Sequence, residues 1–101
     1  MKTIDAFRKS LASDAPPEPL SPALQALWWL GKGNWEQAHK VCQGHEDKDD
    51  CNWVHAHLHR QEGDLRNAGG WYRRAGKPMP EGPLQEEWAL LAAEFLARSA
   101  D

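Results

Sequence analysis

The chain has no long hydrophobic run, no excess of basic residues and only two cysteines. Its 101 residues carry a net charge of −3 with His neutral, which gives no electrostatic reason to expect binding to nucleic acid or to an anionic membrane. No apolar run approaches the roughly 18 residues that a membrane-spanning helix needs. Residues 1–9 lack the apolar core of a signal peptide. We therefore expect a cytoplasmic protein in which Cys42 and Cys51 are reduced.

Patterns typical of strands and of common enzymes are also missing. No alternation of apolar and polar residues is long enough for a β-strand, which predicts an all-α fold. The sequence contains no nucleophile elbow, phosphate-binding loop or dinucleotide fingerprint. We therefore favour a protein that is not an enzyme, because enzymatic activity would have to rest on its histidines alone.

A segment of the chain occurs twice, thirty positions apart, with three identical positions and one similar one. The pairs are Ala26/Ala56, Gly33/Gly63, Ala38/Ala68 and Asn34/Asp64. An internal period of this length is typical of stacked helical hairpins, in which alanines allow close helix crossing and glycine makes the turn.

Helical periodicity and breakers predict six helices in one domain that spans residues 1–101. Thr3 is the expected N-cap of the first helix, Ser21 that of the second, and Asp50 or Asn52 that of the fourth. A proline-rich linker, 15–21, follows the first helix, and residues 76–83 contain too much proline and glycine to be helical. The expected helices are 3–12, 22–32, 35–43, 51–62, 65–75 and 83–98.

The repeat resembles the tetratricopeptide family. Its small residues and turn glycine have the family's spacing, and the second copy adds Tyr72, Ala75 and Pro80 where the family has an aromatic, an alanine and a proline. The resemblance implies two antiparallel hairpins, 22–43 and 51–76, in a right-handed superhelix with an N-terminal helix and a C-terminal capping helix. The thirty-residue period is shorter than the family's repeat of about thirty-four, and two copies are fewer than the usual three or so.

The second copy also resembles a group of small, uncharacterised microbial and fungal proteins. The resemblance rests on residues 53–64 together with Asn67-Ala68 and residues 71–76. It brings no assigned activity.

The tetratricopeptide resemblance implies a module that binds a protein or peptide on the inner face of its first helices. In the second copy the corresponding positions are Trp53, His57, Arg60 and Gln61. An aromatic beside a guanidinium suits an acidic or C-terminal peptide. The first copy is apolar there, so we keep two alternatives: coverage by helix 3–12, or a homodimer without an external ligand.

Histidines distinguish the second copy from the first, so we expect any site to lie there. His55, His59 and Glu62 fall in one helical row, whereas His57 lies on another face. This row suits a zinc ion or a general acid–base pair, which would make the protein a small metal-dependent or acid–base enzyme. Alternatively, the histidines are interior residues bonded to neighbours such as Glu62 or Asp64. No other cofactor is expected.

A second possible zinc set combines two thiols with two imidazoles. Its members are Cys42, His45, Cys51 and His55. Their spacing matches no standard zinc finger, and the alternative is that Cys42 packs as a small buried hydrophobe.

Tryptophan is abundant, and two adjacent glycines interrupt a helix. The six tryptophans are expected to build most of the core, with one or two free to line a recognition groove. Gly69 and Gly70 each cost a helix about 1 kcal/mol relative to alanine. We expect close packing there, with Trp88 or another aromatic lying over the glycines.

Overall fold

The computed structural model describes residues 3–98, and within them it has an all-α fold, as the sequence predicts. The described residues contain no strand. None of their helices has the length and apolar character needed to cross a membrane. The helices are α1 (Ile4–Ser10), α2 (Pro22–Gly31), α3 (Trp35–Gln43), α4 (Asp49–Gln61), α5 (Leu65–Ala75) and α6 (Leu84–Arg98).

Local side chains begin most of these helices where the sequence predicts. The Thr3 hydroxyl accepts a hydrogen bond from the Ala6 amide, and the Ser21 hydroxyl does the same for Leu24. The repeated turns are alike: Asn34 and Asp64 cap α3 and α5 through their side chains. Gly33 and Gly63 precede these caps with φ values of 82° and 85°, which glycine adopts without strain.

The predicted cap of α4 is wrong. Neither Asp50 nor Asn52 caps the helix, because it begins earlier, at Asp49, with Lys48 in the capping position and no side-chain cap bond. Asp49 and Asp50 instead lie in the first turn, where negative charge is favoured by the helix dipole. The Asn52 amide turns back and donates to the Glu46 carbonyl at 3.0 Å.

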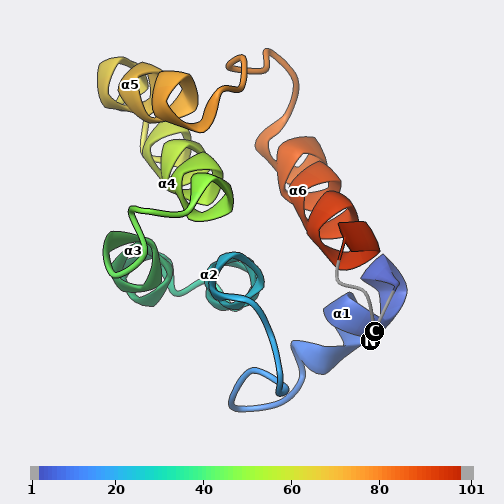
Figure 1. The fold of residues 1–101 in the computed structure, drawn as a ribbon. Coiled ribbons are helices and arrows are strands. Elements are labelled where there is room, and N and C mark those ends of the chain that lie inside the picture. Colours follow the sequence, from blue (N-terminus) through green and yellow to red (C-terminus); the bar gives the residue numbers. More distant parts are fainter. Residues whose placement is uncertain (1–2, 99–101) are drawn as a thin grey trace.

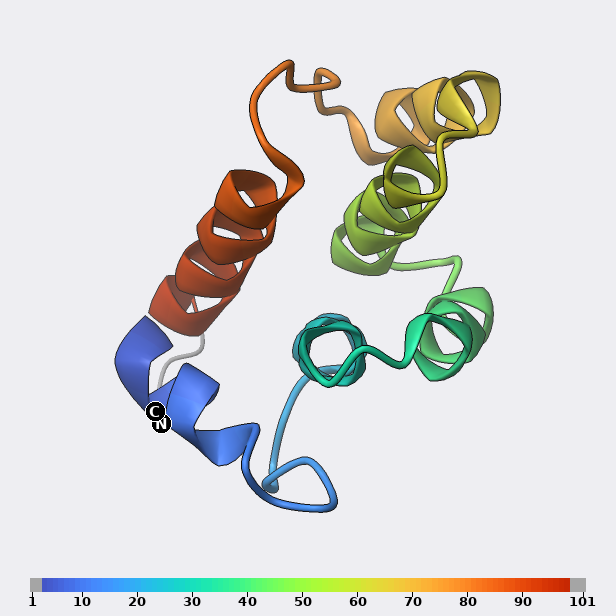
Figure 2. The same cartoon turned by 180° about the vertical axis from the view of Figure 1, so that it is seen from behind.

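The helices form two sequential pairs that α6 covers from one side. Helix α2 packs on α3, α4 packs on α5, and the two pairs meet through α2, α3 and α4. In Figures 1 and 2, α3 and α5 lie on the far side of α2 and α4 from α6. Helix α6 contacts α2 and α4, and α1 packs on α6. Helix α6 therefore covers the face that α2 and α4 share.

The core lies between these layers. Its largest fully buried side chains include Trp28, Phe7 and Leu91, from α2, α1 and α6. The Trp28 indole N–H donates to the Ser10 hydroxyl at 3.1 Å, and the Lys32 ammonium donates to the carbonyls of Leu11 and Ser13. These bonds fix α1 on α2. All six tryptophans are buried or half-buried, so each has a structural role.

The expected close approach at Gly69 and Gly70 is wrong, and it occurs at Gly31 instead. A Cβ at Gly70 would meet nothing nearer than an Arg73 guanidinium nitrogen at 3.9 Å, and one at Gly69 would meet only ordinary contacts. A Cβ at Gly31 would lie 2.9 Å from a Leu11 methyl and 3.2 Å from the Trp88 ring. Trp88 therefore packs over the end of α2.

These two environments predict opposite responses to alanine. Gly70→Ala should raise the free energy of unfolding by about 1 kcal/mol, because alanine favours the helix and the space is open. Gly31→Ala should leave the protein about 1–3 kcal/mol less stable than Gly70→Ala, because Leu11 and Trp88 must move. Urea unfolding of both variants measures the difference. Equal stabilities would contradict the close approach at Gly31.

Candidate functional site

Helix α4 divides the polar side chains of the second copy between two opposite faces. His55 and His59 face α3 and α5, whereas His57 and Arg60 face α6. The sequence predicts this separation of His57 from the other two histidines. It places one polar cluster on each side of the same helix.

The cluster toward α3 and α5 contains three histidines, not two. His39, from α3, lies beside His55, with their Nε2 atoms 3.0 Å apart. The rings of His55 and His59 are stacked, with centroids 4.9 Å apart. One ring nitrogen from each of His39, His55 and His59 lies within 4.8 Å of those of the other two. These residues are called the histidine cluster below.

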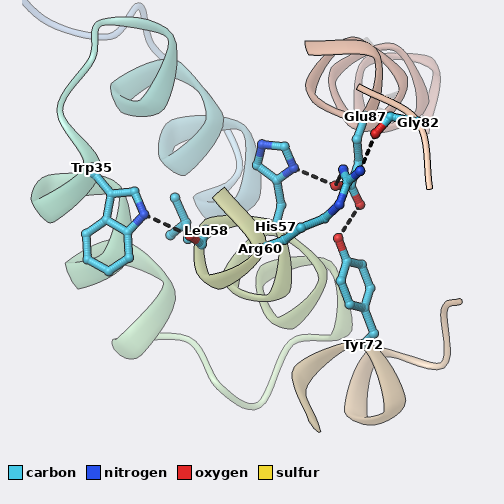
Figure 3. Close-up of polar contacts among 7 residues, drawn as sticks. All are labelled: Trp35, His57, Leu58, Arg60, Tyr72, Gly82 and Glu87. Atoms are coloured by element: carbon cyan, nitrogen blue, oxygen red, sulfur yellow. Dashed lines mark hydrogen bonds and ion pairs between the residues drawn. The ribbon is translucent and has the colours of Figure 1, made fainter. Parts of the chain in front are cut away.

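Tryptophans hold the rings of the histidine cluster. His55 stacks on Trp71 with centroids 3.9 Å apart, and His39 stacks on Trp35 at 4.7 Å. The Trp35 indole N–H in turn donates to the Leu58 carbonyl at 2.9 Å, which ties α3 to α4 (Figure 3). His55 is buried and His39 is half-buried, so the cluster opens toward solvent on the side of His39.

Burial keeps two of these rings neutral. It lowers the pKa of His55 to about 3, with further contributions from His39 and His59. Burial also lowers the pKa of His39, and His59 adds to the effect. The Nδ1 atom of His55 has no hydrogen-bond partner among the described residues. Because His39 and His55 are neutral, each has one ring nitrogen with a lone pair, and these nitrogens lie close together in the cluster.

The structure brings together His55 and His59, two of the three residues predicted for a metal site, but not the third, Glu62. Glu62 accepts a hydrogen bond from Nδ1 of His59 at 2.6 Å. The Glu62 carboxylate converges with His59 and Asp64, but not with His55. The alternative prediction of an interior histidine bonded to Glu62 is confirmed for His59.

The opposite face of α4 meets a buried carboxylate. Glu87, on α6, is 4% exposed. Its Oε1 accepts from His57 Nδ1 at 2.6 Å and from Arg60 at 3.0 Å, and its Oε2 accepts from the Tyr72 hydroxyl at 2.6 Å. Arg60 also donates to the carbonyl of Gly82, in the segment just before α6 (Figure 3). Three helices therefore meet at one anion.

The donors determine the charge of this group. Burial alone raises the pKa of Glu87, but the hydrogen bond from His57 and then that from Tyr72 oppose it. Together with Arg60 they leave the pKa below the usual value of 4.5. Glu87 is therefore a carboxylate at neutral pH, paired with a guanidinium that is always charged.

Three of the four predicted partner-binding residues lie under α6. Trp53 is buried against Phe95 of α6, and His57 and Arg60 are engaged by Glu87. These side chains offer a peptide little exposed surface in this arrangement. These residues are covered from within the chain by α6, whereas the predicted coverage by helix 3–12 concerned the apolar face of the first copy. Gln61 alone is exposed.

A groove nevertheless opens beside Gln61, where α1, α2, α4 and α6 converge. Its volume is about 670 Å³. Its floor is apolar, with Leu30 from α2 and the half-buried Trp88 from α6, and Arg8 and Gln85 supply polar groups. The lining residues are Arg8, Leu11, Leu30, Gly31, His57, Gln61, Leu84, Gln85 and Trp88. These residues are called the α1–α6 groove below.

The cysteine-containing zinc set does not assemble. Cys42 and Cys51 are buried free thiols, and the His45 ring bonds to the Val41 carbonyl at 2.9 Å. Among residues 3–98, no group of convergent metal-binding side chains contains either cysteine. Burial raises the pKa of Cys51 to about 11 and that of Cys42 further, so both remain protonated.

Sequence reasoning missed His39, Glu87 and Arg8. His39 lies four positions after Trp35, so the two share a helical face, but only the packing of α3 on α4 shows that this face meets His55. Glu87 stands within an apolar stripe of α6, and a charge in such a stripe is a signal for a buried partner. Arg8 gives no comparable signal.

Comparison of the chain with protein-family models, curated proteins and solved structures finds no match.

The geometry around Glu87 predicts how stability depends on pH. Because the pKa of Glu87 is lower in the folded state, its ionised form stabilises the fold above about pH 4.5, and this contribution is lost as the pH falls through the folded-state value. Glu87→Gln should reduce the free energy of unfolding at pH 7 by about 2 kcal/mol. It should also flatten the loss of stability below pH 4.5.

Urea unfolding between pH 3 and 7 measures both effects. Glu86→Gln is the matched control, because Glu86 is exposed on the same turn of α6, and it should follow the wild type. Parallel curves for Glu87→Gln and the wild type would contradict the assignment of a charged, hydrogen-bonded Glu87.

Proposed function

We propose that the protein is an interaction module that binds a carboxylate-bearing peptide segment in the α1–α6 groove. The observation behind this proposal is an exposed guanidinium beside a half-buried indole at the groove. Arg8 lies over the Trp88 ring, 5.7 Å from its centroid. Among the described residues, no carboxylate pairs with Arg8.

The chemistry of the groove favours one kind of occupant. A guanidinium binds a carboxylate through two parallel N–H donors, and the exposed amides of Gln61 and Gln85 can donate or accept beside it. Leu30, Leu84 and Trp88 offer apolar surface for a neighbouring side chain. The sequence predicts the same combination of an aromatic and an arginine at Trp53 and Arg60. In the groove, the combination consists of Trp88 and Arg8, which a partner can reach.

Contacts within the protein hold the Trp88 side chain of the groove in place. The Trp88 indole N–H donates to the Leu27 carbonyl at 3.0 Å, and the Trp88 ring packs against Phe7 at 5.8 Å. A volume of about 670 Å³ lies within the usual range for ligand sites. A peptide would therefore meet a preformed surface, which lowers the entropic cost of binding.

The test uses random synthetic octapeptides in two forms, with a free and with an amidated C-terminus. We expect selected peptides to combine a carboxylate with a large apolar residue. Loss of binding on amidation assigns the carboxylate to the C-terminus, and retained binding assigns it to an acidic side chain. Arg8→Gln should weaken binding of the selected peptides by about 10- to 100-fold, the effect of losing a charged hydrogen bond.

Lys9→Gln is the matched control, because Lys9 is an exposed cation on the same helix outside the groove, and it should bind as the wild type does. Fluorescence anisotropy measures the affinities. Equal binding by Arg8→Gln and wild type would contradict the proposal, as would a library without any selected peptide. A homodimer that buries Trp88, found by sizing and by quenching of indole fluorescence, would replace it with the homodimer predicted as an alternative.

A further inference from the structure

We propose that His39, His55 and His59 bind one zinc ion, each through one ring nitrogen, on the face of α4 opposite the α1–α6 groove. This site differs from the predicted set in its third ligand, which is His39 from the first hairpin and not Glu62. It is independent of the peptide-binding proposal.

The distances between the ring nitrogens support this assignment. Ligand nitrogens around a tetrahedral zinc ion at 2.0–2.1 Å lie about 3.3 Å apart. The Nε2 atoms of His39 and His55 are 3.0 Å apart, and one ring nitrogen of His59 lies within 4.8 Å of one ring nitrogen of each of the other two histidines. Small ring rotations, of which the half-buried His39 is capable, therefore complete the set.

The environment holds the rings in place before any ion arrives. Trp71 and Trp35 stack on His55 and His39, so each ring is limited to small rotations that keep its aromatic contact. Ligands fixed by packing lose little entropy on binding. Stacking on Trp35 and Trp71 and the hydrogen bond to Glu62 therefore hold these three imidazoles ready for an ion.

Glu62 determines which nitrogen of His59 faces the ion. It accepts a hydrogen bond from Nδ1 of His59, so the Nε2 atom of His59 carries the lone pair. Metal-binding histidines commonly donate their other N–H to a carboxylate in this way, which fixes the tautomer and raises the basicity of the ligand. The Asn67 amide lies 3.5 Å from His59 Nε2, a long contact that an ion can replace.

The charge of the cluster also suits a cation. Burial favours neutral His39 and His55, and neutral imidazole is the form that binds metal. The 3.0 Å contact between the Nε2 atoms of His39 and His55 requires a proton on one of them, and the Nδ1 atom of buried His55 has no hydrogen-bond partner among the described residues. Binding of zinc at Nε2 of both rings requires only that the ring that carries this proton, His39 or His55, carry it on Nδ1 instead.

Three imidazoles leave one position of a tetrahedral zinc ion open. His39 is the half-buried member of the cluster, so water could reach that position from its side. A zinc-bound water in such a site ionises near neutral pH. The metal-dependent enzyme predicted as an alternative would thus have its chemical basis here.

The test is a calorimetric titration of the untagged, metal-free full chain with zinc chloride. We expect one ion per chain. His39→Gln should weaken binding by more than about 100-fold, because removal of a supporting carboxylate alone costs 10- to 100-fold. Glu62→Gln should weaken zinc binding by about 10- to 100-fold. His45→Gln is the matched control, because His45 is a half-buried histidine outside the cluster, and it should bind as the wild type does.

Cobalt(II) provides a second measurement on the unaltered protein, which does not depend on the folding of any variant. A strong visible absorption typical of four-coordinate cobalt supports the site, and the weak spectrum of six-coordinate cobalt overturns it. Absence of stoichiometric zinc, or equal affinities for His39→Gln and His45→Gln, also overturns it. Arg8→Gln should bind zinc as the wild type does, so failure of the peptide-binding proposal and failure of this one can be distinguished.

Discussion

The hydrogen-bonded carboxylate of Glu87 joins α6 to α4 and α5. A carboxylate that is 4% exposed is stable only if its lost hydration is replaced. His57 and Arg60 replace it from α4 and Tyr72 from α5, so one anion joins both helices of the second hairpin to α6. An apolar stripe can slide along its partner, whereas an anion with three directional donors fixes the register of α6.

The position of α6 in turn determines which surfaces remain available. Because α6 covers the inner face of α4, Trp53 and His57 are buried and cannot receive a partner. The same helix brings Trp88 against Gly31 and Arg8, and a groove of about 670 Å³ results. On its opposite face, α4 remains free to meet α3 and α5, where the histidine cluster forms. The two proposed sites thus lie back to back on one helix.

The sequence predicts well those features that depend on neighbouring residues. The all-α class and the caps at Thr3 and Ser21 follow from local hydrogen bonding and periodicity. The separation of His57 from His55 and His59 follows from helical geometry alone. The error at the start of α4 is also local: the helix begins at Asp49, so the predicted caps Asp50 and Asn52 lie inside it. The resemblance to the tetratricopeptide family remains a prediction.

Features that depend on how helices cross could not be predicted. His39 meets His55 across sixteen positions and His57 meets Glu87 across thirty, and no spacing rule determines which turn of one helix faces which turn of another. The glycines show the same limit. Gly70 and Gly31 differ in what packs over them, a property of neighbouring helices and not of the glycine or its own segment.

A double-mutant cycle between Tyr72→Phe and Glu87→Gln tests the central role of Glu87 most directly. Each change removes one side of a buried bond between α5 and α6 and leaves the side-chain volume nearly unchanged. If Glu87 joins these helices, the two losses of unfolding free energy should be non-additive, with a coupling of at least about 1 kcal/mol. Additivity to within about 0.3 kcal/mol, the behaviour of independent sites, would contradict the account.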